Sequence, residues 1–393
     1  MSTETTPDYE SMLVNCVHWG LCLQHCPTYI QTGDENNSPR GRLQMIRAIE
    51  EKRVPDSDTS DFYIDECVGC LACMSACPAN VPYEDILLRK KAERVENGKP
   101  VDGRIKLVSK LVTRPKLFNA LTFPVRLLRN LGIRPSSMLV DGSPALTQSS
   151  AAYARHLMQK HQPTGPVVGL LTGCLMEATY REINFATIRV LIALGFQVRV
   201  PEDQTCCGAV LEHSGLPGKD ELSKQNNTAF SASGVEVILT NSSGCGLALQ
   251  HGSETPVEDV LQFIAKQTLT PRRKIETDRI YVDQPCHLVH GQRKTIPQSI
   301  MNALGAPCEL APMSTECCGA GGTYNITHED NSNAIINRKT AFLEDSDDKA
   351  LILATANHIC MQQWQKGLHM AGLSRKVKVR HLIQLMDQVL AVD

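Results

Sequence analysis

The cysteines of this chain carry its chemistry, because all but one of the 16 fall into short groups with regular spacing. The clearest group is "CVGCLACMSACP", in which Cys67, Cys70, Cys73 and Cys77 are followed by a proline. This C-x-x-C-x-x-C-x-x-x-C-P spacing is typical of two-cluster ferredoxins, where three thiolates of a run bind one cubane and the fourth binds the other. A zinc ribbon uses two separated C-x-x-C pairs and fits the run poorly. The run therefore predicts iron–sulfur binding.

A second, incomplete run precedes it in "NCVHWGLCLQHCP", where Cys16, Cys22 and Cys26 lead into a proline. Trp19 stands where the fourth cysteine of the pattern is missing. By the ferredoxin pattern, Cys26 completes the set begun by the first three cysteines of the complete run, and Cys77 joins Cys16 and Cys22. The first set then has four protein thiolates, whereas the second has three.

The cluster beside Trp19 is left open by this count. Three thiolates suit a [3Fe–4S] cluster, or a [4Fe–4S] cluster whose fourth iron takes a non-cysteine ligand such as water or His18. A third interpretation is a degenerate or empty site over which Trp19 packs. The choice matters because cluster type and charge are among the main controls on reduction potential.

The C-terminal part of the chain carries one cysteine pattern twice, with an offset of about 111 to 115 residues. Each copy has a single cysteine, then a Cys-Cys-Gly turn, then another single cysteine. The predicted metal ligands are Cys174, Cys206, Cys207 and Cys245 in the first copy, and Cys286, Cys317, Cys318 and Cys360 in the second. Four thiolates suit either a [4Fe–4S] cubane or a tetrahedral zinc ion. The glycine of each turn, Gly208 or Gly319, lets the backbone bend close to the metal centre.

The segments around these cysteines predict how they are positioned. In each copy, strand-like apolar runs alternate with helical stretches, and the cysteines fall at or just beyond the strand ends, where open α/β sheets gather their ligands. We therefore predict an α/β fold with two pseudo-symmetric Cys-Cys-Gly (CCG) units, preceded by an α-helical, ferredoxin-like domain. The predicted ranges are 1–102 for the ferredoxin-like domain, 103–165 for a basic helical connector and linker, and 166–270 and 271–393 for the two CCG units.

The connections between these groups are predicted to be mainly helical. "SPRGRLQMIRAIEE" predicts a helix over residues 38–51, and another is expected after Pro82. Residues 103–140 contain eight Lys or Arg and no Asp or Glu, and Pro115 and Pro124 are expected to cut them into short helices. This segment suits peripheral contact with an anionic membrane or an acidic partner, or else two helices that bury their apolar faces. Residues 141–165 are expected to form a linker.

The composition excludes several classes of protein. A net charge of −2 gives no attraction to nucleic acid, and no apolar run reaches the roughly 18–20 residues of a membrane span. Grouped free thiols favour a reducing, cytoplasmic location, with peripheral attachment to the inner face of the cell membrane as the alternative. No G-x-G-x-x-G fingerprint, nucleophile–base pair or carboxylate dyad is evident, so we assign no flavin, NAD or catalytic residue to this chain.

Three further residues stand beside the main patterns. His287 and His290 follow Cys286 closely, and they either tune a cluster or move protons, or simply pack and hydrogen-bond locally. Cys308 lies outside every pattern and is expected to be a lone buried thiol.

Together, these motifs resemble those of the iron–sulfur subunit of glycolate oxidase. The resemblance covers the chain from about residue 12 to its end and includes "CVHWGLCLQHCPTY", "CVGCLACMSACP", "VPEDQTCCGAVLEHSG", "PCHLVHGQ", "CCGAGGTYNI" and "ANHICMQQ". It implies two ferredoxin-type clusters before two CCG domains, with FAD-binding partner subunits that oxidise glycolate to glyoxylate. Electrons would then pass toward a quinone or another membrane acceptor of the respiratory chain.

The chain departs from related patterns at two kinds of position. The family usually has a cysteine where Trp19 stands. The related heterodisulfide reductase type has a fifth cysteine in each CCG unit, whereas this chain has Ser242 and Asn357 there. A five-thiolate cluster that cleaves disulfides is therefore disfavoured. The alternatives to an electron-transfer subunit are a lactate-utilisation or heterodisulfide-reductase-like protein whose CCG units reduce a disulfide or quinone, or CCG units that bind zinc as a partner scaffold.

Overall fold

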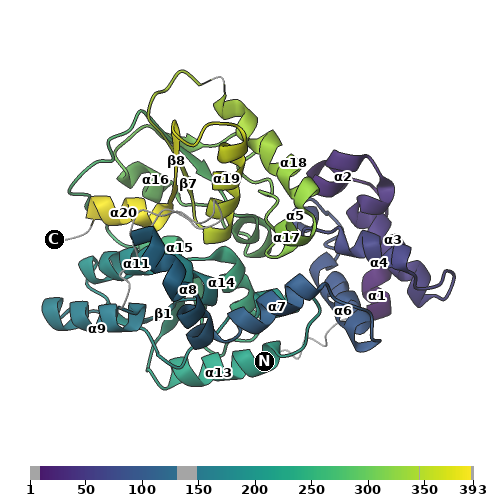
Figure 1. The fold of residues 1–393 in the computed structure, drawn as a ribbon, viewed down its shortest axis with the longest axis horizontal. Coiled ribbons are helices and arrows are strands. Elements are labelled where there is room, and N and C mark those ends of the chain that lie inside the picture. The colour runs from purple at the N-terminus through teal and green to yellow at the C-terminus, as the bar shows by residue number, and fades with distance from the viewer. Residues whose placement is uncertain (1–8, 131–147, 345, 391–393) are drawn as a thin grey trace.

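The computed structural model describes residues 9–130, 148–344 and 346–390. Its N-terminal third is a group of short helices around one core, shown in purple and blue in Figure 1. Three isoleucines with no exposed surface, Ile46, Ile64 and Ile86, form the centre of that core. The helices are α1 (Tyr9–Val14), η1 (Leu23–His25), α2 (Pro27–Thr32), η2 (Glu35–Asn37), α3 (Pro39–Glu50), α4 (Asp58–Asp65), α5 (Ala72–Ser75) and α6 (Tyr83–Glu96).

Two of these helices confirm sequence predictions. Helix α3 begins directly after Ser38, whose hydroxyl accepts a hydrogen bond from the Gly41 backbone N–H at 3.0 Å. Pro39 occupies the first helical position, where its missing N–H costs nothing. Helix α6 begins directly after Pro82, as expected. These helices connect the two cysteine loops and hold them against the common core.

The connector is more helical than the sequence suggested. It contains α7 (Gly103–Val112), α8 (Pro115–Asn130) and α9 (Ser150–His161). The prediction that Pro124 ends a helix is wrong, because it lies inside α8. Pro124 is exposed, so water can hydrate the carbonyl group that loses its helical partner. Residues 131–140 of the basic segment lie outside the described residues.

Helix α9 also corrects the predicted linker over residues 141–165. Ser149 caps this helix by accepting a hydrogen bond from the Ala152 backbone N–H at 3.2 Å. Ala154 and Leu157 are buried in the core of the following unit. The serines that suggested a loop therefore provide a helix cap, which the composition of the segment did not reveal.

Two four-stranded parallel sheets form the rest of the chain and confirm the predicted α/β class. The first has the strand order β2-β1-β3-β4 and the second β6-β5-β7-β8, which is the same order in each repeat. The strands are β1 (Val167–Leu171), β2 (Gln197–Arg199), β3 (Val237–Thr240), β4 (Val257–Asp259), β5 (Arg279–Asp283), β6 (Cys308–Leu310), β7 (Leu351–Thr355) and β8 (Val377–His381). All pairings are parallel.

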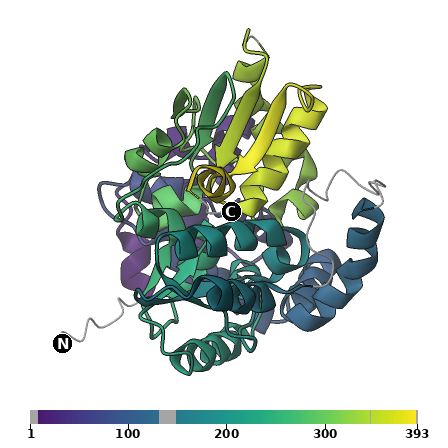
Figure 2. The same ribbon diagram turned by 90° about the vertical axis from the view of Figure 1, so that its left-hand side faces the viewer.

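Helices connect and cover these strands, and the two units pack against each other (Figures 1 and 2). They are α10 (Cys174–Thr179), α11 (Arg181–Ala193), α12 (Ala209–His213), α13 (Lys219–Ser231), α14 (Ser243–Gln250), α15 (Val260–Ile264), η3 (His287–Gly291), α16 (Gln298–Ala303), α17 (Tyr324–Thr327), α18 (Glu329–Thr340), η4 (Ala341–Leu343), α19 (His358–Met370) and α20 (Leu382–Leu390). One core cluster contains Leu170 and Leu239 of the first unit and Leu353 and Leu385 of the second.

The described helices include none that is long and apolar enough to cross a bilayer. Any contact of the described residues with a membrane would therefore use the surface of the fold.

Candidate functional site

The eight cysteines of the repeat occupy matching places in the two sheets. Cys174 and Cys286 each come three residues after a strand, β1 or β5. The Cys-Cys pairs begin seven residues after β2 or β6, and Cys245 and Cys360 come five residues after β3 or β7. The carboxyl ends of neighbouring parallel strands meet at one edge of each sheet. The predicted placement at the strand ends is therefore confirmed.

The Cys-Cys-Gly turns have the same backbone geometry in both units. Gly208 has φ +86° and Gly319 has φ +85°, a left-handed conformation that side chains with a Cβ rarely adopt. A Cβ at Gly319 would lie 2.8 Å from the Ser332 carbonyl oxygen. In each turn the glycine N–H points to the first thiol of the pair, at 3.5 Å from Cys206 Sγ and 3.3 Å from Cys317 Sγ. The turn thus supplies a hydrogen-bond donor as well as two sulfur atoms.

The four thiols of the first CCG unit lie together as one set. The Sγ atoms of Cys206 and Cys174 are 3.6 Å apart. The Cys207 thiol hydrogen-bonds both to Cys206 and to Cys245, and the Cys206 contact, with burial, raises the pKa of Cys207. The predicted ligands of this unit are therefore neighbours in space.

The four thiols of the second unit form a similar set with one additional neighbour. The Cys317 thiol hydrogen-bonds to Cys286, to Cys318 and to Cys70 of the ferredoxin-like domain. Hydrogen bonds with Cys317 and Cys360 keep the pKa of Cys318 well below its usual value. The set is therefore complete and reaches the N-terminal domain.

The inner ferredoxin set is also brought together. Cys26, Cys67, Cys70 and Cys73 line one small cavity, as the ferredoxin pattern predicts. Cys67 is partly exposed, whereas the other three are buried. The fully buried Arg42 lines the same cavity, and its positive charge partly offsets the effect of burial on the Cys26 pKa, which is raised. A buried cation beside four thiols favours their ionised form.

The outer set surrounds the opening sequence motif. Cys16, Cys22 and Cys77 are partly exposed and pack against the N-terminal core. Trp19 is 70% exposed, so the interpretation that its ring packs over an empty or degenerate site is wrong. The Arg40 guanidinium donates to the His18 backbone oxygen at 3.1 Å and holds this loop. Both cluster types expected for a set of three thiolates are compatible with this arrangement.

A junction between domains connects the inner ferredoxin set with the second CCG set. Cys70 and Cys317 hydrogen-bond to each other and share one buried cluster. His287 Nε2 lies 2.9 Å from the Gly69 backbone oxygen, and the His290 ring lies 2.9 Å from Ser75 Oγ. Both histidines therefore contact the ferredoxin loop, in addition to any local role. No sequence pattern indicated this junction, because the partners are more than 200 residues apart.

His213 is a member of the junction that the sequence did not indicate. Its ring stacks on that of His287, with centroids 5.4 Å apart. Burial, followed by the charge of His287, lowers the pKa of His213 to about 3. His213 therefore stays neutral at physiological pH and joins the first CCG unit to the other two parts.

A second connection joins the two CCG sets. Ser242 Oγ donates to Asn357 Oδ1 at 3.0 Å, and Asn357 Nδ2 is 3.5 Å from Cys360 Sγ. Ser242 also hydrogen-bonds to Cys245. The positions at which the heterodisulfide reductase type has its fifth cysteines therefore form a polar bridge between the two CCG sets.

The donor chemistry of these sets fits iron–sulfur clusters. Each consists only of sulfur ligands, in groups of three or four, which suit iron–sulfur clusters and also zinc. The thiols contact one another, and within the described residues no group of three or more Cys, His, Asp or Glu surrounds a point suited to a single metal ion. Cys308 stands apart on β6 and is only partly buried, in contrast to the prediction, and burial raises its pKa to about 11.

Comparison with known proteins finds the same arrangement of domains. Residues 12–81 match the family described as a 4Fe-4S dicluster domain, and residues 168–250 and 282–364 match the CCG cysteine-rich domain. The probable glycolate oxidase iron–sulfur subunit of Bacillus subtilis is 29% identical, over 96% of this chain and 94% of its own length. The glycolate oxidase iron–sulfur subunit of Escherichia coli is 29% identical over 97% and 95%. A fumarate reductase (CoM/CoB) subunit of Methanothermobacter marburgensis is 30% identical over 98% and 74%.

Proposed function

Because the chain belongs to the family of iron–sulfur oxidoreductase subunits in which a 4Fe-4S dicluster domain precedes two CCG domains, we propose that it is the electron-transfer subunit of a glycolate, or closely related 2-hydroxy-acid, oxidase. In this proposal an FAD-binding partner subunit oxidises the substrate. The present chain receives the electrons and passes them toward a quinone or another membrane acceptor. The substrate is chosen by the flavin subunit.

The contact between Cys70 and Cys317 is the observation that carries the proposal. One thiol belongs to the inner ferredoxin set and the other to the second CCG set. Clusters held by adjacent thiols lie close enough for direct electron transfer without a mobile carrier. The Ser242–Asn357 bridge extends the connection to the first CCG set. We therefore propose that all four cysteine sets bind iron–sulfur clusters and form one path.

The surface of α7 and α8 supports a peripheral membrane contact at the inner face of the cell membrane. Leu107, Leu117, Leu121 and Phe123 are between 40% and 59% exposed. They share the two helices with five basic side chains and no acidic ones between residues 103 and 124. Exposed apolar groups beside Lys and Arg suit the headgroup region of an anionic bilayer. The alternative, in which these helices bury their apolar faces, is disfavoured by that exposure.

Anaerobic reduction of the purified chain tests the proposed function. The purified chain is mixed with glycolate, with and without its FAD-binding partner, and electron paramagnetic resonance spectra are recorded. We expect cluster signals to change only when the flavin subunit is present. Reduction of a disulfide by the chain with an artificial donor alone would contradict the proposal. Zinc near two per chain, with iron only for the ferredoxin sets, would also contradict it.

The same spectra test the outer set. We expect the wild-type protein to show an oxidised [3Fe–4S] signal, because Trp19 replaces the fourth thiol. A Trp19→Cys variant should then convert this signal to that of a [4Fe–4S] cluster. Absence of the [3Fe–4S] signal, with iron sufficient for complete cubanes, would instead indicate a non-cysteine ligand such as His18.

A further inference from the structure

A cleft of about 300 Å³ opens between the ferredoxin-like domain and both CCG units. Its walls come from α4 and α6, the start of α7, the end of α12, and the turn around α17. Much of the lining is apolar and includes Val68, Leu87, Val101 and Ile105. A volume of this size lies at the small end of ligand sites and suits a compound of one or two rings.

The cleft reaches the inner ferredoxin set at one cysteine. Cys67 lines it and is the one member of that set that is not buried. The Tyr83 hydroxyl lies 3.6 Å from Cys67 Sγ and fixes the side chain. A molecule in the cleft would therefore come closer to the inner cluster than a molecule elsewhere on the surface near the other three cysteines.

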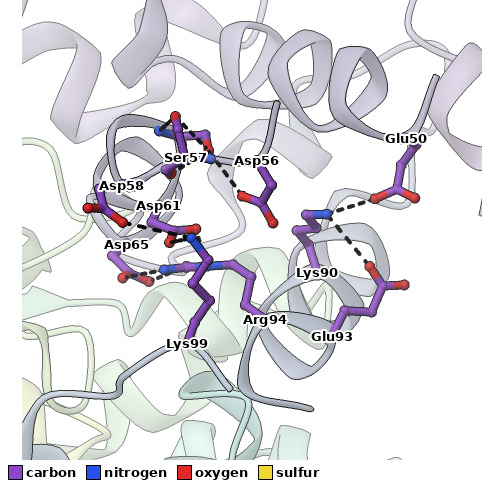
Figure 3. A network of polar contacts seen from close by, with 11 residues as sticks. Glu50, Asp56, Ser57, Asp58, Asp61, Asp65, Lys90, Glu93, Arg94 and Lys99 are labelled. Carbon is purple, nitrogen blue, oxygen red and sulfur yellow. Dashed lines mark hydrogen bonds and ion pairs between the residues drawn. The ribbon is translucent and has the colours of Figure 1, made fainter. Parts of the chain in front are cut away.

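Most charges in the wall of the cleft already have partners. Arg94 contacts Asp61 at 2.6 Å and Asp65 at 3.0 Å, and Lys99 contacts Asp61 at 3.1 Å. Figure 3 shows these side chains converging on one another. Lys91 lies outside this network. Its ammonium donates to the His213 backbone oxygen at 3.2 Å, and no carboxylate lies within ion-pair distance of it in the described part of the chain.

We propose that this cleft binds a quinone headgroup and that Lys91 donates a hydrogen bond to one of its carbonyl oxygens. Apolar walls suit the ring, and a single available ammonium suits a neutral acceptor atom. Ile105 lines the cleft, and Leu107, two residues further along α7, is 59% exposed. The cleft thus opens beside the surface proposed to contact lipid, from which an apolar quinone tail would enter.

This inference rests on the proposed function, which supplies the electrons. The quinone accepts two electrons, one at a time, from the reduced clusters by way of the set that contains Cys67. It takes up two protons from water at the cleft, and quinol is the product. The 2-hydroxy acid, oxidised by the flavin subunit, is the ultimate reductant.

Binding of a short-tailed benzoquinone to the full, cluster-loaded chain tests the inference by equilibrium dialysis in the absence of substrate. We expect Lys91→Met to weaken binding at least tenfold and Ile105→Trp, which fills the cleft, to abolish it. Lys99→Met is the matched control, because it removes a cleft lysine whose charge is already paired, and it should change binding less than twofold. Iron content and circular dichroism establish that each variant is folded and loaded.

A second measurement separates this inference from the proposed function. In Lys91→Met, the flavin subunit and glycolate should still reduce the clusters, while quinol formation falls at least tenfold. No quinone binding by the wild-type chain, or equal binding by all variants, would overturn the quinone site and leave the proposed function intact. Lys91-dependent binding of a carboxylate anion, without binding of quinone, would also overturn it.

Discussion

The two CCG units have nearly the same cysteine geometry but different surroundings. Strand order, the spacing of each cysteine from its strand and the left-handed glycine are the same in both. The second set contacts the ferredoxin loop through Cys317 and Cys70. The first set has no such sulfur neighbour among the described residues. The repeat thus determines where the thiols lie, while the neighbouring domain determines which set exchanges electrons directly with the ferredoxin part.

The polar groups buried in the two units also differ. In the first, Asn241 donates to Asn184 at 2.9 Å and to Thr187 at 3.0 Å. In the second, Lys339 forms a buried ion pair with Asp283 at 2.6 Å. Lys339 Nζ also donates to the backbone oxygens of Met313 and Glu316, just before the Cys-Cys-Gly turn. The second set therefore has a buried cation that positions its turn, whereas the first relies on neutral amides.

The largest expected effect comes from removing one thiol of each turn. Cys317→Ser should eliminate the second CCG cluster and also alter the spectrum of the inner ferredoxin cluster, because Cys317 hydrogen-bonds to Cys70. The matched variant Cys206→Ser should eliminate only the first CCG cluster. Iron content and electron paramagnetic resonance measure both effects. Equal disturbance of the ferredoxin signal by both variants would show that the junction is not specific to the second unit.

The next effect concerns stability. Lys339→Met should lower the free energy of unfolding by about 3–5 kcal/mol, because it leaves a buried carboxylate without its partner. Asn241→Ala in the first unit should cost about 1–3 kcal/mol, the usual range for an unsatisfied buried polar group. Urea unfolding in a Trp19→Phe background, followed by fluorescence of the buried Trp364, measures the transition of the second unit.

The double variant Asp283→Leu, Lys339→Met is the control for this interpretation. It removes both charges and should recover much of the stability that the single variant loses. If the double variant is as unstable as Lys339→Met alone, the contacts of Lys339 with the turn, and not its charge, carry the effect.

The sequence was sufficient to predict the cysteine sets and the repeated units, because ligand spacing and apolar periodicity are local properties of the chain. The strand-end positions of Cys174 and Cys286 follow from the apolar runs before them. The Cys70–Cys317 and Ser242–Asn357 contacts are different, because they depend on how separately folded units dock. No local pattern encodes that docking, so the junction could be recognised only in three dimensions.

The errors in the prediction have local physical causes. Pro124 was expected to end a helix, but one lost hydrogen bond on an exposed face was insufficient to break α8. Ser149 was read as part of a linker, although a serine before a helical stretch is also a favoured cap. Trp19 was one aromatic residue beside cysteines, and its exposure depended on the tertiary fold.

A smaller contrast lies at the ends of β4 and β8, where Asp259 and His381 accept equivalent hydrogen bonds from Leu261 and Ile383. Burial raises the pKa of Asp259 to about 7 and lowers that of His381 to about 4. Asp259 should therefore reduce stability as pH rises from about 4 to 7, and His381 should reduce it as pH falls from about 6.5 to 4. Each slope is at most about 1.4 kcal/mol per pH unit.

Urea midpoints between pH 4 and 8 test this contrast with matched asparagine variants. Asparagine retains the side-chain oxygen that accepts the backbone hydrogen bond but does not titrate. Asp259→Asn should flatten the loss of stability toward neutral pH, whereas His381→Asn should flatten the loss toward acidic pH. Identical pH profiles for the two variants would show that these residues do not titrate differently in the two units.

The smallest expected effect concerns the bridge between the CCG sets. Ser242→Ala removes the hydrogen bond to Asn357 without removing any cysteine. We expect electron exchange between the two CCG clusters to slow a few-fold, while exchange between the inner ferredoxin cluster and the second CCG cluster keeps its rate. Rapid-freeze electron paramagnetic resonance distinguishes the two steps. Thr240→Ala, which shortens a buried hydroxyl side chain of the same strand end that no bridge uses, is the control. An unchanged rate in Ser242→Ala would mean that the packing of the two units, without this hydrogen bond, is sufficient to connect the sets. A slowing of both steps would mean that the substitution had disturbed the junction at Cys317 as well, and the difference between the two units would then be less sharp than the geometry indicates.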